Sequence, residues 1–148
     1  MAEAPRDASR PSGMPWARAI AVWLLIITVE SVHGVLRVLL LQPLVGDFRA
    51  RQVSVFIASA LILAIACACA PWLNARSTRA RTGVGLLWVV LTVAFEIGLG
   101  RGAMNASWER ILSDYDLPHG GLMLFGLAFL ALSPWLAARL RAWAAAKR

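Results

Sequence analysis

The sequence is poor in cysteine, with only Cys67 and Cys69 among 148 residues. Both lie in an apolar block, and on a helix their side chains point about 200° apart, so a disulfide between them is not expected. Two such residues cannot build the disulfide framework of a small secreted domain. We interpret both as small lipophilic residues of a membrane segment.

The motifs of the common enzyme classes are also missing. The chain contains no glycine-rich phosphate loop, no nucleophile elbow and no H-E-x-x-H zinc motif. The sequence offers no evident general base for any of its serines, so it gives little support to a hydrolase function. The sequence therefore predicts no catalytic residue and no cofactor, and it favours a function other than enzymatic catalysis.

Acidic residues are scarce: 8 Asp and Glu stand against 15 Lys and Arg, a net charge of +7. On a soluble protein this excess would indicate nucleic-acid binding. Here 59% of the residues are hydrophobic and gather in long blocks, with most of the basic residues between them. This pattern predicts a protein of the lipid bilayer whose basic loops meet headgroups, and it argues against nucleic acid as a partner.

Four of the apolar blocks are long enough to cross a bilayer, which takes about 20 helical residues. We predict an all-α fold, an integral membrane four-helix bundle, within residues 16–141. The predicted spans are about 16–41, which Gln42-Pro43 should end, then 53–73, 82–100 and 120–140, where Pro134 should kink the helix. Residues 1–15 are predicted to be disordered and 142–148 to form a basic cytoplasmic tail.

The stretch between the third and fourth spans is too polar to cross. Its apolar residues recur at helical spacing on one side, namely Trp108, Ile111, Leu112 and Tyr115. This pattern predicts a short amphipathic helix with Asn105 or Ser107 as its N-cap. We expect the helix to lie at the membrane interface or on the end of the bundle.

Basic residues near the span ends predict the orientation. The two termini and the loop at 74–81 share one side and carry ten of them, whereas the other side carries four. The side with more basic residues should be cytoplasmic. Trp16, Trp72 and Trp135 fall near the same interface, as an aromatic belt does. We therefore predict a multi-pass protein of a bacterial inner membrane with both termini in the cytoplasm.

The first span carries three ionisable residues at i, i+3 and i+7, so they point in nearly the same direction. Such groups are costly in a bilayer and usually face a protein interior or a water-filled cavity. Counting about 1.5 Å per residue brings the acid of the third span to a similar depth. The predicted outward-facing polar site consists of Glu30, His33, Arg37, Glu96 and Arg101. We expect the two acids to pair with Arg37 or Arg101, which leaves His33 as the titratable excess.

The rim of this site is predicted to come from Trp108, Asp114, Tyr115, Asp116 and His119. The cluster has two equally weighted interpretations: a structural ionic lock between the first and third spans, or a pocket in which Glu30 or His33 exchanges protons or binds a ligand. A metal site from Glu30, His33, Glu96 and His119 is a weaker alternative, because these ligands have no fixed spacing.

An acid in the first span of a small four-span protein resembles the small multidrug resistance transporters. His33, Arg37, the long outer loop and the basic tail depart from that pattern, so no residue role is taken from it. Our first hypothesis is a transporter or ligand-binding membrane protein, with transport requiring a homodimer. The second is an accessory protein that docks a membrane protein partner. The third is a membrane enzyme acting on lipid or envelope material through Asp114 or Asp116.

Overall fold

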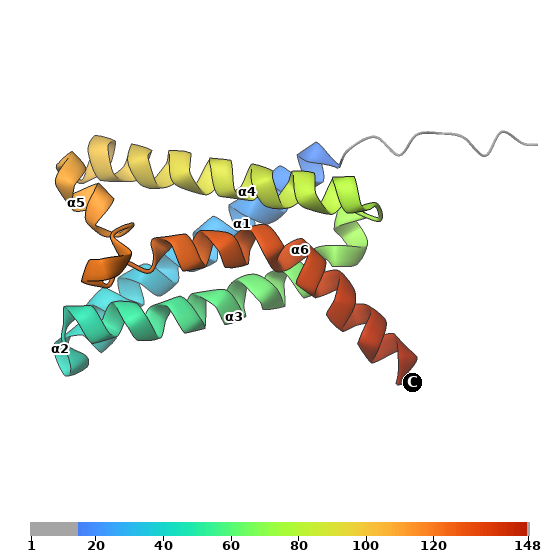
Figure 1. The fold of residues 1–148 in the computed structure, drawn as a ribbon, viewed down its shortest axis with the longest axis horizontal. Helices are drawn as coiled ribbons and strands as arrows, with labels where there is room; N and C mark the ends of the chain where they lie inside the picture. The colour runs from blue at the N-terminus through green and yellow to red at the C-terminus, as the bar shows by residue number, and fades with distance from the viewer. Residues whose placement is uncertain (1–14, 148) are drawn as a thin grey trace, which may run out of the picture.

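The computed structural model describes residues 15–147, and in this range the protein is all-α (Figure 1). Four long apolar helices pack together, and a short helix lies between the third and the fourth, so the predicted fold class is confirmed. Residues 1–14 of the predicted disordered segment, and Arg148, lie outside the described residues. The elements are α1 (Trp16–Leu36), a π-helical turn (Arg37–Leu41), α2 (Gln42–Val45), α3 (Asp47–Leu73), α4 (Thr78–Gly98), a second π-helical turn (Leu99–Ala103), α5 (Trp108–Ser113), a 3-10 turn (Leu117–His119) and α6 (Met123–Ala146).

Four helical stretches are long and apolar enough to cross a bilayer: Trp16–Val45, Asp47–Leu73, Thr78–Ala103 and Met123–Ala146. No more than 28% of the most apolar window of any of them is buried inside the protein. The remaining apolar surface faces outward, which is stable in hydrocarbon and costly in water. The protein is therefore a multi-pass membrane protein.

The first helical stretch continues past Gln42-Pro43, where the sequence predicted its end. In the π-helical turn the N–H of Gln42 bonds to the carbonyl of Arg37, five residues back. This wider turn accommodates the Pro43 ring, which would otherwise clash with the carbonyl four residues earlier. The stretch ends at Gly46, whose φ of 81° few other residues adopt.

The other long helices also extend beyond the predicted spans. α3 begins at Asp47, and α4 begins at Thr78 behind Ser77, whose hydroxyl accepts a hydrogen bond from the Ala80 N–H at 3.1 Å. α6 continues to Ala146 through most of the predicted tail. A helix ends where its caps and turns allow, whereas hydropathy marks only its apolar middle.

The core joins α1, α3, α4 and α6 around the fully buried Trp88. Its Nε1 donates to the Ala19 carbonyl at 2.8 Å, and one turn further along Trp23 Nε1 donates to Thr92 Oγ1 at 3.0 Å. Together the two bonds set the register of the parallel helices α1 and α4. Gly85, one turn before Trp88 on α4, leaves room for the Ala131 backbone of α6.

Pro134 lies inside α6, and the helix changes direction along its length (Figure 1). A proline has no N–H, so the carbonyl four residues earlier, at Leu130, loses its helical partner. Ser133 Oγ donates to that carbonyl at 2.8 Å. The bend turns the last part of α6 away from α4 (Figure 1).

Candidate functional site

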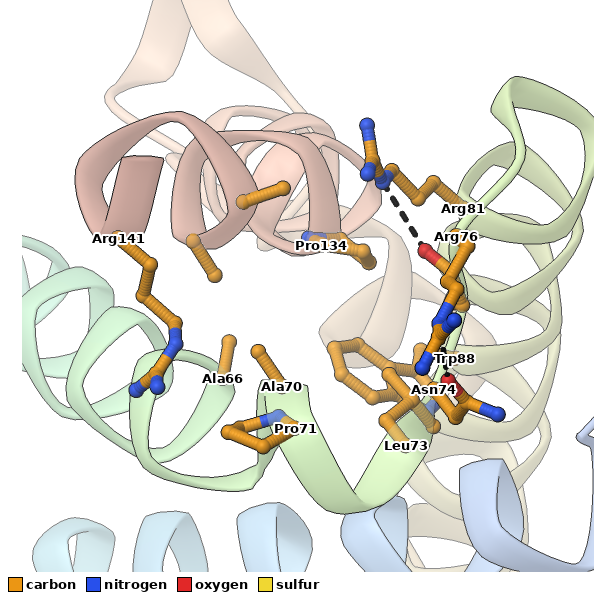
Figure 2. A pocket seen from close by; sticks show the side chains of 13 residues that line it. Ala66, Ala70, Pro71, Leu73, Asn74, Arg76, Arg81, Trp88, Pro134 and Arg141 are labelled. Atoms are coloured by element: carbon orange, nitrogen blue, oxygen red, sulfur yellow. Dashed lines mark hydrogen bonds between the residues drawn. The ribbon is translucent and has the colours of Figure 1, made fainter. Parts of the chain in front are cut away.

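Polar side chains gather at both ends of the bundle. One end, here called the basic end, contains the start of α1, the α3–α4 connection and the end of α6, and a cavity opens there (Figure 2). The opposite end, here called the mixed end, contains α2, α5 and the predicted site residues. Among the described residues all six acids lie toward the mixed end.

The three ionisable residues of the first span turn toward the protein, as their spacing predicts. The side chains of Glu30, His33 and Arg37 are 19%, 15% and 23% exposed. In contrast, Val32 and Val35 on the same stretch are more than half exposed. From Glu30 onward the first helical stretch thus turns its polar side inward and its apolar side toward the lipid, the inverse of a helix in a soluble protein.

Glu30 and His33 form a local pair on α1. His33 Nδ1 lies 3.4 Å from one carboxylate oxygen of Glu30. The second oxygen, Oε1, is buried and has no hydrogen-bond partner among the described residues. A buried, unpaired carboxylate oxygen is costly unless a proton or another donor satisfies it. The pair therefore keeps one carboxylate oxygen free for a proton or for a donor from a ligand.

The predicted pairing of the membrane acids with Arg37 or Arg101 is not formed among the described residues. Arg37 Nη1 lies 3.9 Å from Asp47, at the first turn of α3. Arg101 donates to the Ala106 carbonyl at 2.9 Å and stacks on Trp108, 5.3 Å from the ring centroid. Long side chains reach toward the water-facing end, where an ion pair pays less desolvation than it does within the span.

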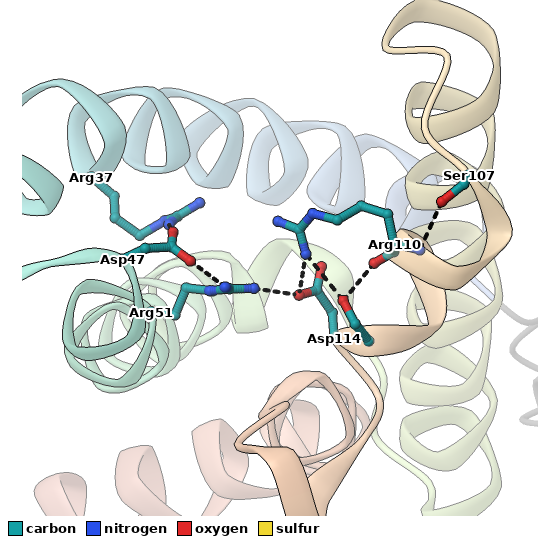
Figure 3. Close-up of polar contacts among 7 residues, drawn as sticks. Arg37, Asp47, Arg51, Ser107, Arg110 and Asp114 are labelled. Atoms are coloured by element: carbon teal, nitrogen blue, oxygen red, sulfur yellow. Dashed lines mark hydrogen bonds and ion pairs between the residues drawn. The ribbon is translucent and has the colours of Figure 1, made fainter.

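Instead, an arginine–aspartate network crosses the mixed end (Figure 3). Arg51 of α3 bonds Asp47 and also donates to Asp114 Oδ1 at 3.0 Å. Arg110 of α5 reaches the same Asp114 oxygen at 3.3 Å. With the Arg37–Asp47 contact, the network joins the π-helical turn after α1, the start of α3, and residues 108–119 around α5, here called the α5 segment. The sequence contains an indication of this network, because Asp47–Arg51 and Arg110–Asp114 are both spaced i, i+4, which is the spacing of ion pairs on a helix. Sequence reasoning missed this indication.

Glu96 lies toward the α5 side of the mixed end, one turn beyond Thr92 on α4. Burial raises the pKa of the nearby Tyr115 phenol, and the negative charges of Glu96 and Asp114 raise it further. The α1–α4 register sets Glu96 level with Ile27, so Glu30 lies about 4.5 Å further along the bundle. The acids thus have similar heights but different polar neighbours: Glu30 contacts His33, whereas Glu96 lies near Tyr115 and Asp114.

The remaining rim residues are spread over the surface of the α5 segment. Trp108 is 53% exposed. His119 Nδ1 lies 2.7 Å from Asp116, and its side chain is 83% exposed. Ser107 forms the N-cap of α5 by accepting from the Arg110 N–H at 3.1 Å. Within residues 15–147, no three His, Cys, Asp or Glu side chains lie close enough together to hold a metal ion.

Sequence reasoning missed the cavity at the basic end, because its walls come from three separate helices. Comparisons with protein families, with curated proteins and with solved structures find no significant match for this chain.

Proposed function

We propose that this protein is a small ligand-binding or transport protein of a bacterial inner membrane, and that the Glu30–His33 pair is its proton- or ligand-binding centre. The observation that carries the proposal is the buried Oε1 atom of Glu30, which has no hydrogen-bond partner among the described residues. An oxygen in that position can take up a proton or accept a hydrogen bond from a ligand.

The positions of the arginines favour a functional centre over an ionic lock. A lock between the first and third spans requires Arg37 or Arg101 to neutralise Glu30 or Glu96. Both arginines are engaged elsewhere, and the Arg51 network already ties the mixed end together. Glu30 is left with a single polar neighbour, the His33 imidazole.

The proposed orientation places the mixed end outside and both termini in the cytoplasm. Seven basic and no acidic residues occupy the described part of the basic end. Two of these arginines stack on interfacial tryptophans, Arg18 on Trp72 and Arg81 on Trp135, with 5.8 and 5.6 Å to the ring centroids. Cationic loops and aromatic belts of this kind mark the cytoplasmic interface. Four helices are too few to enclose a transport pathway, so transport would require a homodimer.

Infrared titration of the protein in lipid nanodiscs tests the binding centre. We expect a carboxyl band that appears on acidification and is lost in Glu30→Gln, and that titrates at a different pH in His33→Gln. Glu109→Gln is the matched control, because Glu109 is an exposed acid of α5. A titration that Glu30→Gln leaves unchanged would remove the proposal.

A second function, docking of a membrane protein partner, is favoured by the apolar surface around α5. Met104, Trp108 and Leu112 are 71%, 53% and 60% exposed beside the charged network. A photoreactive group in place of Trp108 should then crosslink one defined partner in intact membranes. Recovery of only lipid adducts would contradict this second function.

A further inference from the structure

A cavity of about 370 Å³ opens at the basic end, between the end of α3, the start of α4 and the second half of α6 (Figure 2). The half-buried Ala70 of α3 and Ala138 of α6, with the exposed Pro71, form its accessible apolar wall. Ala66, Ala137 and Trp88 also border the cavity but are buried, and the hydrogen bond of Trp88 to Ala19 holds the ring in place. The floor of the cavity is thus apolar and pre-formed.

Three arginines surround this apolar interior: Arg76, Arg81 and Arg141. Each makes a hydrogen bond to a neutral oxygen. Arg76 Nε donates to Asn74 Oδ1 at 2.7 Å, Arg81 Nε to the Ala75 carbonyl at 3.0 Å, and Arg141 Nη1 to the Cys67 carbonyl at 3.1 Å. A guanidinium has five N–H donors, so each arginine keeps further donors for a ligand.

No carboxylate among the described residues neutralises these three charges. The ion pairs in the described part of the chain lie at the mixed end or on α1 near it. Arg81 is held further by the Trp135 ring. The cavity therefore has an uncompensated positive rim above an apolar interior.

We propose that this cavity binds a phosphate-bearing ligand, with the phosphate held by the arginines of the rim, Arg81 and Arg141 among them, and any apolar part against Ala70. Guanidinium groups match phosphate oxygens in geometry and charge. The phosphate is that of an anionic phospholipid headgroup or a free phosphate. The apolar interior favours the lipid, because basic pockets between membrane helices are suited to anionic headgroups.

The experiment is native mass spectrometry of the purified protein in detergent. It is titrated separately with phosphatidylglycerol, phosphatidylcholine and inorganic phosphate. We expect the protein to retain phosphatidylglycerol in preference to phosphatidylcholine. The double variant Arg81→Gln/Arg141→Gln should weaken that retention about tenfold, because two charge-assisted contacts are lost.

The matched control is Arg79→Gln/Arg139→Gln, which removes the same charge from exposed arginines of the same end that do not line the cavity. This control should change retention by less than about twofold. Equal losses in the two double variants, or equal retention of the two lipids without any phosphate binding, would overturn the proposal.

A second variant distinguishes the two sources of phosphate and does not alter the arginines. Ala70→Phe fills the apolar part of the cavity, so it should reduce the retention of phosphatidylglycerol while inorganic phosphate still binds. Retention of inorganic phosphate alone, sensitive to Arg81→Gln/Arg141→Gln, would identify free phosphate as the ligand. Failure of both phosphate sources to bind would end the proposal and would leave the Glu30–His33 centre untouched.

Discussion

Arg141 Nη1 donates to the Cys67 carbonyl, 3.1 Å away, and thereby fastens the end of α6 to α3. In a regular helix this carbonyl would accept from the N–H of residue 71. That residue is Pro71, which has none. A helix defect in α3 thus creates the acceptor that the arginine of α6 uses.

The first prediction follows from this contact. Arg141→Gln should lower the free energy of unfolding by about 0.5–1 kcal/mol, because one hydrogen bond to an exposed partner is lost. In a Pro71→Ala background the loss should be smaller, since the alanine N–H then occupies the Cys67 carbonyl. A double-mutant cycle by denaturant titration in micelles measures the coupling, and strictly additive effects would contradict it.

The second prediction concerns the contact between α4 and α6. A Cβ added at Gly85 would overlap the backbone of Ala131, whereas one added at Gly98 would meet nothing within 4 Å. Gly85→Ala should therefore destabilise the protein by about 1–3 kcal/mol, since backbone cannot move aside as a side chain does. Gly98→Ala should be neutral, or stabilising by up to about 1 kcal/mol. Thermal unfolding of both variants in micelles checks this, and equal midpoints would refute the packing argument.

The third prediction concerns the charge network. Arg51→Gln removes the bridge between Asp47 and Asp114, so the α5 segment should open more readily. Amide hydrogen exchange at residues 108–113 should become several-fold faster, as expected for partly exposed ion pairs worth about 1 kcal/mol. Arg49→Gln is the control, because Arg49 forms no ion pair with the described residues. Unchanged exchange in Arg51→Gln would mean that α5 is held by its apolar contacts alone.

The fourth prediction concerns Tyr115, the single tyrosine of the chain. Its pKa is raised above the usual value of 10.0, chiefly by burial and further by Glu96 and Asp114. The near-ultraviolet absorbance of its phenolate should therefore titrate above pH 10 in the folded protein, and at lower pH after urea unfolding. Asp114→Asn should lower the folded midpoint, whereas Asp116→Asn should leave it nearly unchanged.

The sign of the linked stability change follows from the direction of that shift. The folded protein holds the Tyr115 proton more tightly than the unfolded chain does. Its contribution to stability is complete below the unfolded pKa and is lost as pH rises through the folded pKa. Tyr115→Phe should flatten the alkaline decline in the free energy of unfolding, and an unchanged slope would contradict the assignment.

Much of the architecture was predictable from local patterns. Hydropathy blocks of about 20 residues predict membrane helices, because a bilayer offers the backbone no hydrogen-bond partner. The helical spacing of Trp108, Ile111 and Leu112 likewise predicted α5. The i, i+3 spacing of Glu30 and His33 predicted that they share one side of the helix, because that relation needs no tertiary information.

The rest depends on how the helices cross, which spacing along the chain does not specify. The sequence predicted Arg37 and Arg101 beside the membrane acids. In the structure the guanidinium group of Arg37 contacts Asp47 of α3 instead. The cavity takes its walls from α3, α4 and α6, and the arginines of its rim include Arg81 of α4 and Arg141 of α6. The sequence by itself determined which segments enter the membrane, since that choice depends on local apolar content. Only the tertiary structure decided which charges meet, because ion-pair partners depend on the distances between packed helices.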